Sequence, residues 1–97
     1  MTLTILLCMA AIHLLIKGRV QGVFYRASAK EAAEQMHLTG WIKNTKEGDV
    51  EALVNGSDHQ VQQFVDWCRQ GPPKAQVTDV IVSPATPSSS SGFNIVR

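Results

Sequence analysis

One segment near the start of the chain combines residues that could bind an anion. It runs from Gly18 to Arg26, reads Gly-Arg-Val-Gln-Gly-Val-Phe-Tyr-Arg, and lies between a predicted strand and a predicted helix. The first N–H groups of a helix lack partners within the helix and carry partial positive charge, so a loop leading into them can curl around an anion such as phosphate. Arg26 would add a guanidinium whose fixed donors match phosphate oxygens. The alternative is a tight turn that carries a solvated arginine.

A second segment with polar residues stands at the end of another predicted strand. It runs from Gly40 to Thr45 and reads Gly-Trp-Ile-Lys-Asn-Thr. The amide of Asn44 could hold a water molecule, whereas the alternative is a residue that only shapes the following turn. The glycine-bearing segment has neither the Lys-Ser/Thr ending of a nucleotide P-loop nor a GxGxxG pattern, so a nucleotide fold is not indicated.

The two segments together resemble the two signature motifs of the acylphosphatase family, and the resemblance covers about residues 11–97. It implies hydrolysis of the carboxyl-phosphate bond of acyl phosphates, giving a carboxylate and inorganic phosphate, with no cofactor and no metal. By the family pattern, Arg26 binds the phosphate and Asn44 positions the attacking water. Backbone N–H groups of one loop complete the phosphate cradle, namely those of Gln21, Gly22, Val23, Phe24, Tyr25 and Arg26.

The chemistry of an acyl phosphate agrees with such a site. The leaving group is a carboxylate whose conjugate acid has a pKa of about 4, so it needs little or no protonation by a general acid. Neither segment contains a His, Asp or Glu for that role. Phosphoryl transfer can instead rest on positioning and on stabilisation of charge.

Other functions receive less support from the sequence. A non-catalytic anion-binding module of the same fold is the main alternative, and Asn44 distinguishes the two because a binding module needs no water-positioning amide. A domain cut from a larger carbamoyl-phosphate-handling protein is a related alternative. Nine Lys and Arg against eight Asp and Glu give a formal net charge of +1, which does not indicate a nucleic-acid partner.

The elements that must position these segments alternate along the chain. Strands are predicted over residues 11–17, 41–44, 49–55, 76–82 and 93–96, and helices over 26–37 and from Asp58 to the Gly-Pro-Pro at 71–73. Thr39 and Gly40 are expected to end the first helix, and residues 83–91 are expected to form a low-complexity loop. The order β-α-β-β-α-β, followed by a short final strand, predicts an α+β fold, the ferredoxin-like split βαβ sandwich with two helices on one face of an antiparallel sheet.

The second helix has the clearest local signals. Ser57 and Gln60 are spaced as a capping box at its start. Apolar residues recur at helical spacing to form one buried stripe, namely Val61, Phe64, Val65 and Cys68.

The chain of 97 residues is long enough for one domain, which we expect over residues 11–97 after an apolar extension over 1–10. Residues 3–16 form an almost continuous apolar run. This run is shorter than the roughly 20 residues of a membrane-spanning helix, and no basic segment precedes it as in a signal peptide. Met9 could be the natural start. We therefore expect a cytoplasmic monomer that acts on a small molecule, without a membrane or nucleic-acid partner.

Cysteines and histidines give no further site. Cys8 and Cys68 are expected to be free thiols, because two cysteines without a CxxC pattern indicate neither a disulfide-rich scaffold nor a metal site. His13, His37 and His59 are expected at the surface, away from any candidate nucleophile or ligand.

Overall fold

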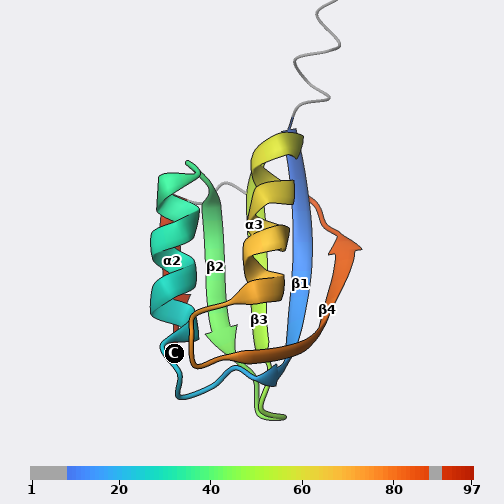
Figure 1. Ribbon diagram of the computed structural model, residues 1–97. Coiled ribbons are helices and arrows are strands. Elements are labelled where there is room, and N and C mark those ends of the chain that lie inside the picture. The colour runs from blue at the N-terminus through green and yellow to red at the C-terminus, as the bar shows by residue number, and fades with distance from the viewer. Residues whose placement is uncertain (1–8, 88–90) are drawn as a thin grey trace, which may run out of the picture.

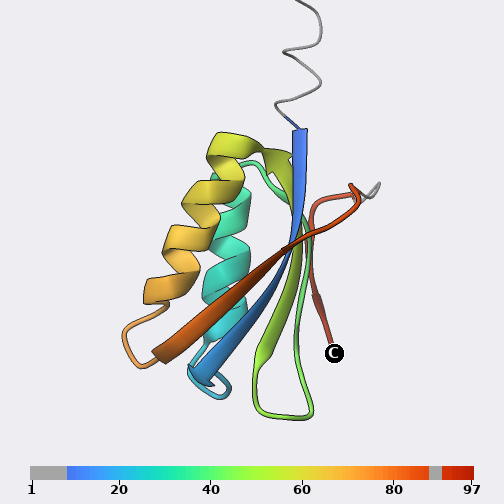
Figure 2. The same cartoon turned by 90° about the vertical axis from the view of Figure 1, so that its right-hand side faces the viewer.

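Two helices pack on one face of a five-stranded sheet in the computed structural model, which describes residues 9–87 and 91–97 (Figures 1 and 2). The strand order is β4-β1-β3-β2-β5. This is the predicted ferredoxin-like arrangement. Along the chain the elements are β1 (Met9–Arg19), α2 (Tyr25–Gln35), β2 (Thr39–Asn44), β3 (Val50–Ser57), α3 (Asp58–Gln70), β4 (Gln76–Pro84) and β5 (Phe93–Val96).

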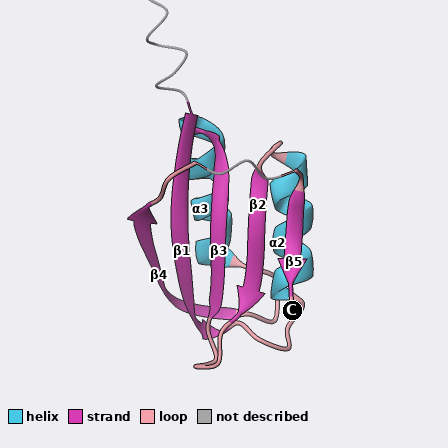
Figure 3. Ribbon diagram, turned by 180° about the vertical axis from the view of Figure 1, so that it is seen from behind, coloured by secondary structure: helices cyan, strands magenta, loops and turns pink. Residues whose placement is uncertain are grey.

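The sheet is mixed, whereas an antiparallel sheet was predicted. β1 to β4 pair antiparallel, but β5 pairs parallel to β2. β4 and β2 lie on opposite sides of the central pair of strands, β1 and β3. β4 ends at the end of the sheet where β2 begins, and β5 begins at that end as well (Figure 3). A strand that starts there can only run back along β2 in the same direction. This parallel pairing brings the ends of β2 and β5 together.

Alternation along β1 places its apolar residues against the helices. Leu14 and Ile16 are fully buried in the core, whereas His13, Leu15 and Lys17 are half-buried on the other face. β1 pairs with β3 on one side and with β4 on the other, so it is an interior strand of the sheet. The predicted two-residue period of this strand is confirmed.

The strands are longer at their ends than predicted. β1 begins at Met9 and ends at Arg19, and β4 continues to Pro84, which pairs with Ile12. A Ser-Pro pair was expected to start a loop, but an edge strand such as β4 accommodates proline because one side needs no N–H donor. Met1 to Cys8, and Ser88 to Ser90 of the predicted low-complexity loop, lie outside the described residues.

α3 has the predicted start, buried stripe and end. Ser57 caps the helix in a complete capping box with Gln60, and Gly71 follows the helix at φ 69°. The four stripe residues are all buried, including Cys68, which is a free thiol as predicted. Cys8 lies outside the described part of the chain. Within that part, neither helix is long and apolar enough to cross a membrane.

α2 ends two residues before the predicted end. His37 takes a left-handed conformation at φ 59°, and the N–H of Leu38 returns to the carbonyl of Ala33 at 2.9 Å, which closes the helix in a Schellman-type turn. Thr39 and Gly40, expected to end the helix, instead begin β2.

Three polar side chains meet on the face of the sheet opposite the helices, which is the face seen in Figure 3. His13 Nε2 and Glu51 Oε2 lie 2.6 Å apart across β1 and β3, with Lys43 Nζ at 3.7 Å from the other carboxylate oxygen. His13 thus lies on the outward face of the sheet, as expected, where it is half-buried beside Glu51 because the two strands pair. His37 and His59 are exposed, as predicted.

Candidate functional site

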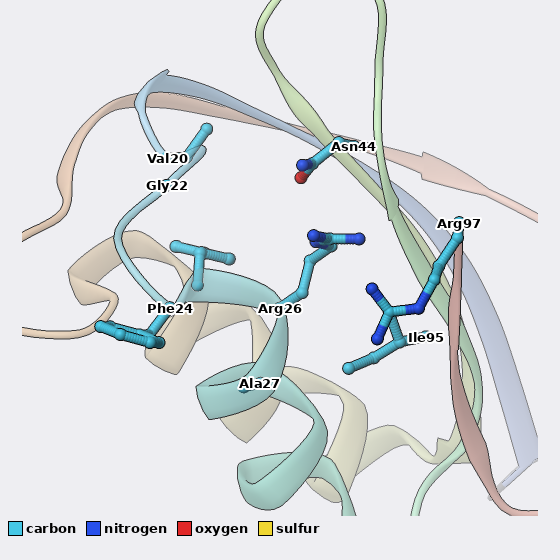
Figure 4. A pocket seen from close by; sticks show the side chains of 9 residues that line it. Val20, Gly22, Phe24, Arg26, Ala27, Asn44, Ile95 and Arg97 are labelled. Atoms are coloured by element: carbon cyan, nitrogen blue, oxygen red, sulfur yellow. The ribbon is translucent and has the colours of Figure 1, made fainter.

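The β1–α2 loop, the start of α2 and the ends of β2 and β5 meet at one end of the sheet (Figure 4). They surround an open cavity of about 280 Å³. The lining residues come from segments far apart in the sequence, and they are Val20, Gly22, Phe24, Tyr25, Arg26, Ala27, Asn44, Ile95 and Arg97.

The backbone of the β1–α2 loop is shaped by two left-handed residues. Gly22 has φ 75°, and Phe24 has φ 62° although it is not glycine. A left-handed residue followed by the right-handed start of a helix turns successive N–H groups toward the same side, which makes a concave anion site. A bulky side chain in this conformation is uncommon and costs free energy, so its presence at the mouth of a cavity suggests a functional constraint.

The start of α2 has no side-chain cap. Phe24 is the N-cap residue, no side chain accepts a hydrogen bond from the first turn, and that turn contains no acidic residue. The helical ladder begins when Ser28 N–H donates to the Phe24 carbonyl at 3.0 Å. The earlier N–H groups of the helix have no partner within it and carry the positive end of the helix dipole. They can therefore bind an anion.

Arg26 reaches from the first turn of α2 into the cavity, and its guanidinium lies between Asn44 and Arg97 in Figure 4. Lys17, Lys30 and Lys43 each pair with a carboxylate, but Arg26 has no ion pair within residues 9–87 and 91–97. An unpaired guanidinium beside free N–H groups provides several donors directed at one place.

Asn44 presents an unpartnered acceptor to the same cavity. Its Oδ1 is buried, and no hydrogen-bond donor of the described residues reaches it. Leaving a buried acceptor unpaired costs about 1–3 kcal/mol, so native proteins rarely keep one without a ligand or water. The arrangement fits an oxygen that accepts a hydrogen bond from a bound water.

The loop is tied directly to the turn that follows Asn44. Gln21 Nε2 donates to the carbonyls of Thr45 and Asp49, at 2.9 and 2.8 Å. Asp49 N–H donates to Thr45 Oγ1 at 3.0 Å, and Lys17 Nζ donates to Asp49 Oδ2 at 2.9 Å. The hydrogen bond and charge of Asp49 raise the pKa of Lys17. These contacts fix the end of β2 relative to the β1–α2 loop.

Tyr25 anchors the start of α2 in the core. Its hydroxyl donates to the Cys68 carbonyl at 2.7 Å, and its ring meets Trp67 edge-on with centroids 5.5 Å apart. Burial raises the pKa of the Tyr25 hydroxyl, and burial also raises the pKa of the Cys68 thiol to about 12. Both groups therefore stay neutral and serve packing rather than acid-base chemistry.

Arg97 lines the cavity, although it was not among the site residues predicted from the sequence. Lys43 and Val96 are partners in the parallel pair of β2 and β5, so Asn44 and Arg97 follow at the same end of the two strands. Ligand sites often lie at the carboxyl ends of parallel strands. Only knowledge of the parallel pairing could have identified this residue, and the sequence predicted an antiparallel sheet.

The structure brings most of the predicted site residues together. Gly22, Phe24, Tyr25, Arg26 and Asn44 all line the cavity. Gln21 and Val23 belong to the same loop but are not among the lining residues, and the side chain of Gln21 instead holds the neighbouring turn.

The lining of the cavity contains donors and one free acceptor, and it includes no His, Asp or Glu. In the described part of the chain, no three His, Cys, Asp or Glu side chains cluster as metal ligands would. Such a set of residues can hold an anion and orient a water beside it. It is poorly suited to proton transfer, so its chemistry must suit a good leaving group.

Comparisons with known proteins agree with this geometry. A family model described as Acylphosphatase matches residues 12–95. An acylphosphatase of Haloquadratum walsbyi is 44% identical over 85 residues, which cover 88% of this chain and 91% of that protein. The structure of an acylphosphatase from Coxiella burnetii has a TM-score of 0.87 at 36% identity and covers 91% of this chain and 93% of that chain. One from Bacillus subtilis has a TM-score of 0.87 at 33% identity, over 92% of this chain and 99% of that chain.

Proposed function

Because the chain belongs to the acylphosphatase family and hydrolyses the carboxyl-phosphate bond of acyl phosphates, we propose that its reaction takes place in the cavity between the β1–α2 loop and the ends of β2 and β5. Arg26 and the backbone N–H groups of residues 21–26 bind the phosphate group. Asn44 holds the attacking water. The observation that carries this proposal is the buried Oδ1 of Asn44, which faces the cavity without a donor from the described residues.

The arrangement suits an in-line displacement at phosphorus. Asn44 Oδ1 accepts a hydrogen bond from the water, which leaves a lone pair of the water oxygen free to attack. A new P–O bond forms to this oxygen while the bond between phosphorus and the carboxyl oxygen breaks, and the carboxylate departs with the bonding electrons. One proton of the water stays on the attacking oxygen and the other passes to a phosphoryl oxygen, so the second product is dihydrogen phosphate. Donors from Arg26 and the loop stabilise the charge on the equatorial oxygens throughout.

The absence of acid-base groups from the lining is consistent with this mechanism. A carboxylate leaving group is stable without protonation because its conjugate acid has a pKa of about 4. An Asp or Glu in the lining would instead repel the phosphate. Arg97 adds a second positive charge at the cavity, although the whole chain has a net charge of only +1.

We also propose the setting in which the enzyme acts. It is a cytoplasmic monomer that takes a small acyl phosphate and binds neither nucleic acid nor membrane. Residues 11–97 form the active domain, and residues 1–10 are an extension that catalysis does not need. The support is that every residue lining the cavity lies between Val20 and Arg97, after the extension, and that the net charge is close to neutral.

The test is hydrolysis of benzoyl phosphate by the full chain, with EDTA present, compared with the Asn44→Ala variant. We expect the wild type to keep its turnover in the presence of the chelator. We expect the kcat of the variant to be at least about 100-fold lower, because removal of one group that acts on the transition state typically has an effect of this size. The inhibition constant of inorganic phosphate should change less than about threefold, because Asn44 acts on the water.

The matched control is Asn94→Ala, since Asn94 is an exposed amide on the adjacent strand β5. It should leave kcat unchanged. Near wild-type turnover by Asn44→Ala would show that another group positions the water. Loss of phosphate affinity in that variant would show that Asn44 is a phosphate ligand or a structural support.

A further inference from the structure

Phe24 is an apolar side chain in an unexpected place. With 76% of its surface exposed, it is the most exposed of the large hydrophobic residues that the structure describes. It also occupies the left-handed conformation at the mouth of the cavity. The backbone conformation would be cheaper with glycine, and the exposed ring gains nothing from the core. A role in binding would explain why a large ring stands there.

An apolar groove lies beside this ring. It has a volume of about 260 Å³ and is lined by Val23, Phe24, Ser28, Pro72, Pro73 and Lys74. Phe24 lines both this groove and the cavity that Arg26 and Asn44 line, so the groove and the cavity adjoin at this residue. A dry cavity of about 150 Å³ is enough to hold one benzene ring. The groove is therefore large enough for the acyl part of a small substrate.

The geometry of in-line displacement also places the leaving acyl group near Phe24. Asn44 and Phe24 both line the cavity, and Figure 4 shows them on different sides of it. In an in-line displacement the attacking and leaving oxygens lie on opposite sides of phosphorus. If the water is held by Asn44, the leaving carboxylate points toward the loop and the ring of Phe24.

We propose that Phe24 and the groove beside it form the acyl subsite of this enzyme and select acyl phosphates with an apolar, ring-sized acyl group. The inference rests on the proposed phosphate and water positions, and it adds the substrate class. The Phe24 ring stacks on the acyl group, and Pro72 and Pro73 provide the opposite apolar surface. A short acyl group such as acetyl reaches neither surface.

The experiment compares kcat/KM for benzoyl phosphate with kcat/KM for acetyl phosphate, in the wild type and in Phe24→Gly. Glycine removes the ring and still permits φ 62°. The ratio of the two values cancels any general effect on the loop. Comparing this ratio between wild type and variant also cancels the difference in intrinsic reactivity between the two substrates. We expect the ratio to fall about tenfold, mainly through a higher KM for benzoyl phosphate. Phe24→Tyr keeps the ring and should keep the ratio within twofold.

Pro73→Ala is a second variant outside the phosphate loop, and it should lower the same ratio by about twofold to threefold. An unchanged ratio in Phe24→Gly and Pro73→Ala, with normal turnover in the wild type, would overturn the acyl subsite alone. A fall in Phe24→Tyr equal to that in Phe24→Gly would overturn it too, because the effect would then be structural. Retained turnover in Asn44→Ala would instead refute the proposed water position on which the subsite depends.

Discussion

The two helices pack on the same face of the same sheet, yet they begin in opposite ways. At α3, Ser57 Oγ accepts a hydrogen bond from Gln60 N–H at 3.2 Å, Gln60 Oε1 accepts one from Ser57 N–H at 3.3 Å, and Asp58 adds a negative charge. At α2 the N-cap is Phe24, no side chain caps the turn, and Arg26 places a positive charge at the positive end of the helix.

This difference separates a helix start built for stability from one kept open for a ligand. A side-chain cap contributes about 1 kcal/mol, and a favourable charge in the first turn about 0.3–1 kcal/mol. α2 has neither, and its start is held by the tertiary hydrogen bond from Tyr25 to the last turn of α3. The free N–H groups and the unpaired Arg26 are suited to bind a phosphate, at a cost in local stability.

The largest expected effect tests the open end of α2 through Arg26→Lys. Lysine keeps the charge but lacks the planar pair of donors, so it cannot reproduce the same contacts to phosphate. We expect kcat/KM for acyl phosphate hydrolysis to fall at least about 100-fold, which corresponds to about 3 kcal/mol of transition-state stabilisation. Thermal unfolding should change little, because Arg26 makes no ion pair within the described residues.

The control for this variant is Arg69→Lys, at the exposed last turn of α3. It should leave both hydrolysis and unfolding unaffected. If Arg26→Lys kept near wild-type turnover, charge alone would be sufficient at this position and the open helix start would not need a forked donor.

The same comparison shows how far the sequence could predict the fold. The start, the buried stripe and the end of α3 were all predicted, because they depend on residues three or four positions apart. The left-handed conformation of Phe24 and the turn at His37 could not be predicted, since neither is a glycine. Non-local pairing was the main gap. The parallel partner of β2 and the continuation of β4 to Pro84 depend on strands distant in sequence.

Site residues that belong to local motifs were predicted, whereas those that depend on non-local pairing were missed. Arg26 and Asn44 belong to sequence motifs, so they could be proposed before the structure, and the cavity includes both. Arg97 was missed because it reaches the cavity only through the parallel pairing of β5. The side-chain role of Gln21, which holds the turn after Asn44, was missed because it joins segments 24 and 28 residues apart.

A smaller effect is expected from Tyr25→Phe, which removes the tertiary bond at the start of α2. The Cys68 carbonyl then loses a buried donor, so the free energy of unfolding at pH 7 should fall by about 1–2 kcal/mol. Activity should fall as well if this bond keeps the phosphate loop in place. Urea unfolding followed by tryptophan fluorescence measures the first effect.

The pH dependence of stability gives the same variant a second test. Tyr25 and Cys68 have raised pKa values in the folded chain, so above about pH 9–10 the unfolded chain binds fewer protons at these groups than the folded chain. Their contribution to stability is therefore present at lower pH and is lost as pH rises, at up to about 1.4 kcal/mol per pH unit for each group. Above pH 10 the decline should be shallower in Tyr25→Phe, and equal slopes would contradict burial of a neutral Tyr25.

The smallest expected effect comes from closing the open helix start with Ala27→Glu. Ala27 is the third helical residue of α2, the position that Gln60 holds in α3, so a glutamate there can accept from the Phe24 N–H and stabilise the helix by about 0.5 kcal/mol. The same carboxylate repels phosphate. One pair of unit charges 5 Å apart in water contributes about 0.8 kcal/mol, so KM should rise about fourfold. Ala27→Gln, which can cap without charge, should raise KM less.

Ser57→Ala opens the start of the other helix, α3, and should lower the free energy of unfolding by about 1 kcal/mol with KM unchanged. If Ala27→Glu stabilised the protein while KM stayed constant, the free N–H groups of α2 would not be part of the phosphate site, and the contrast between the helices would concern stability alone.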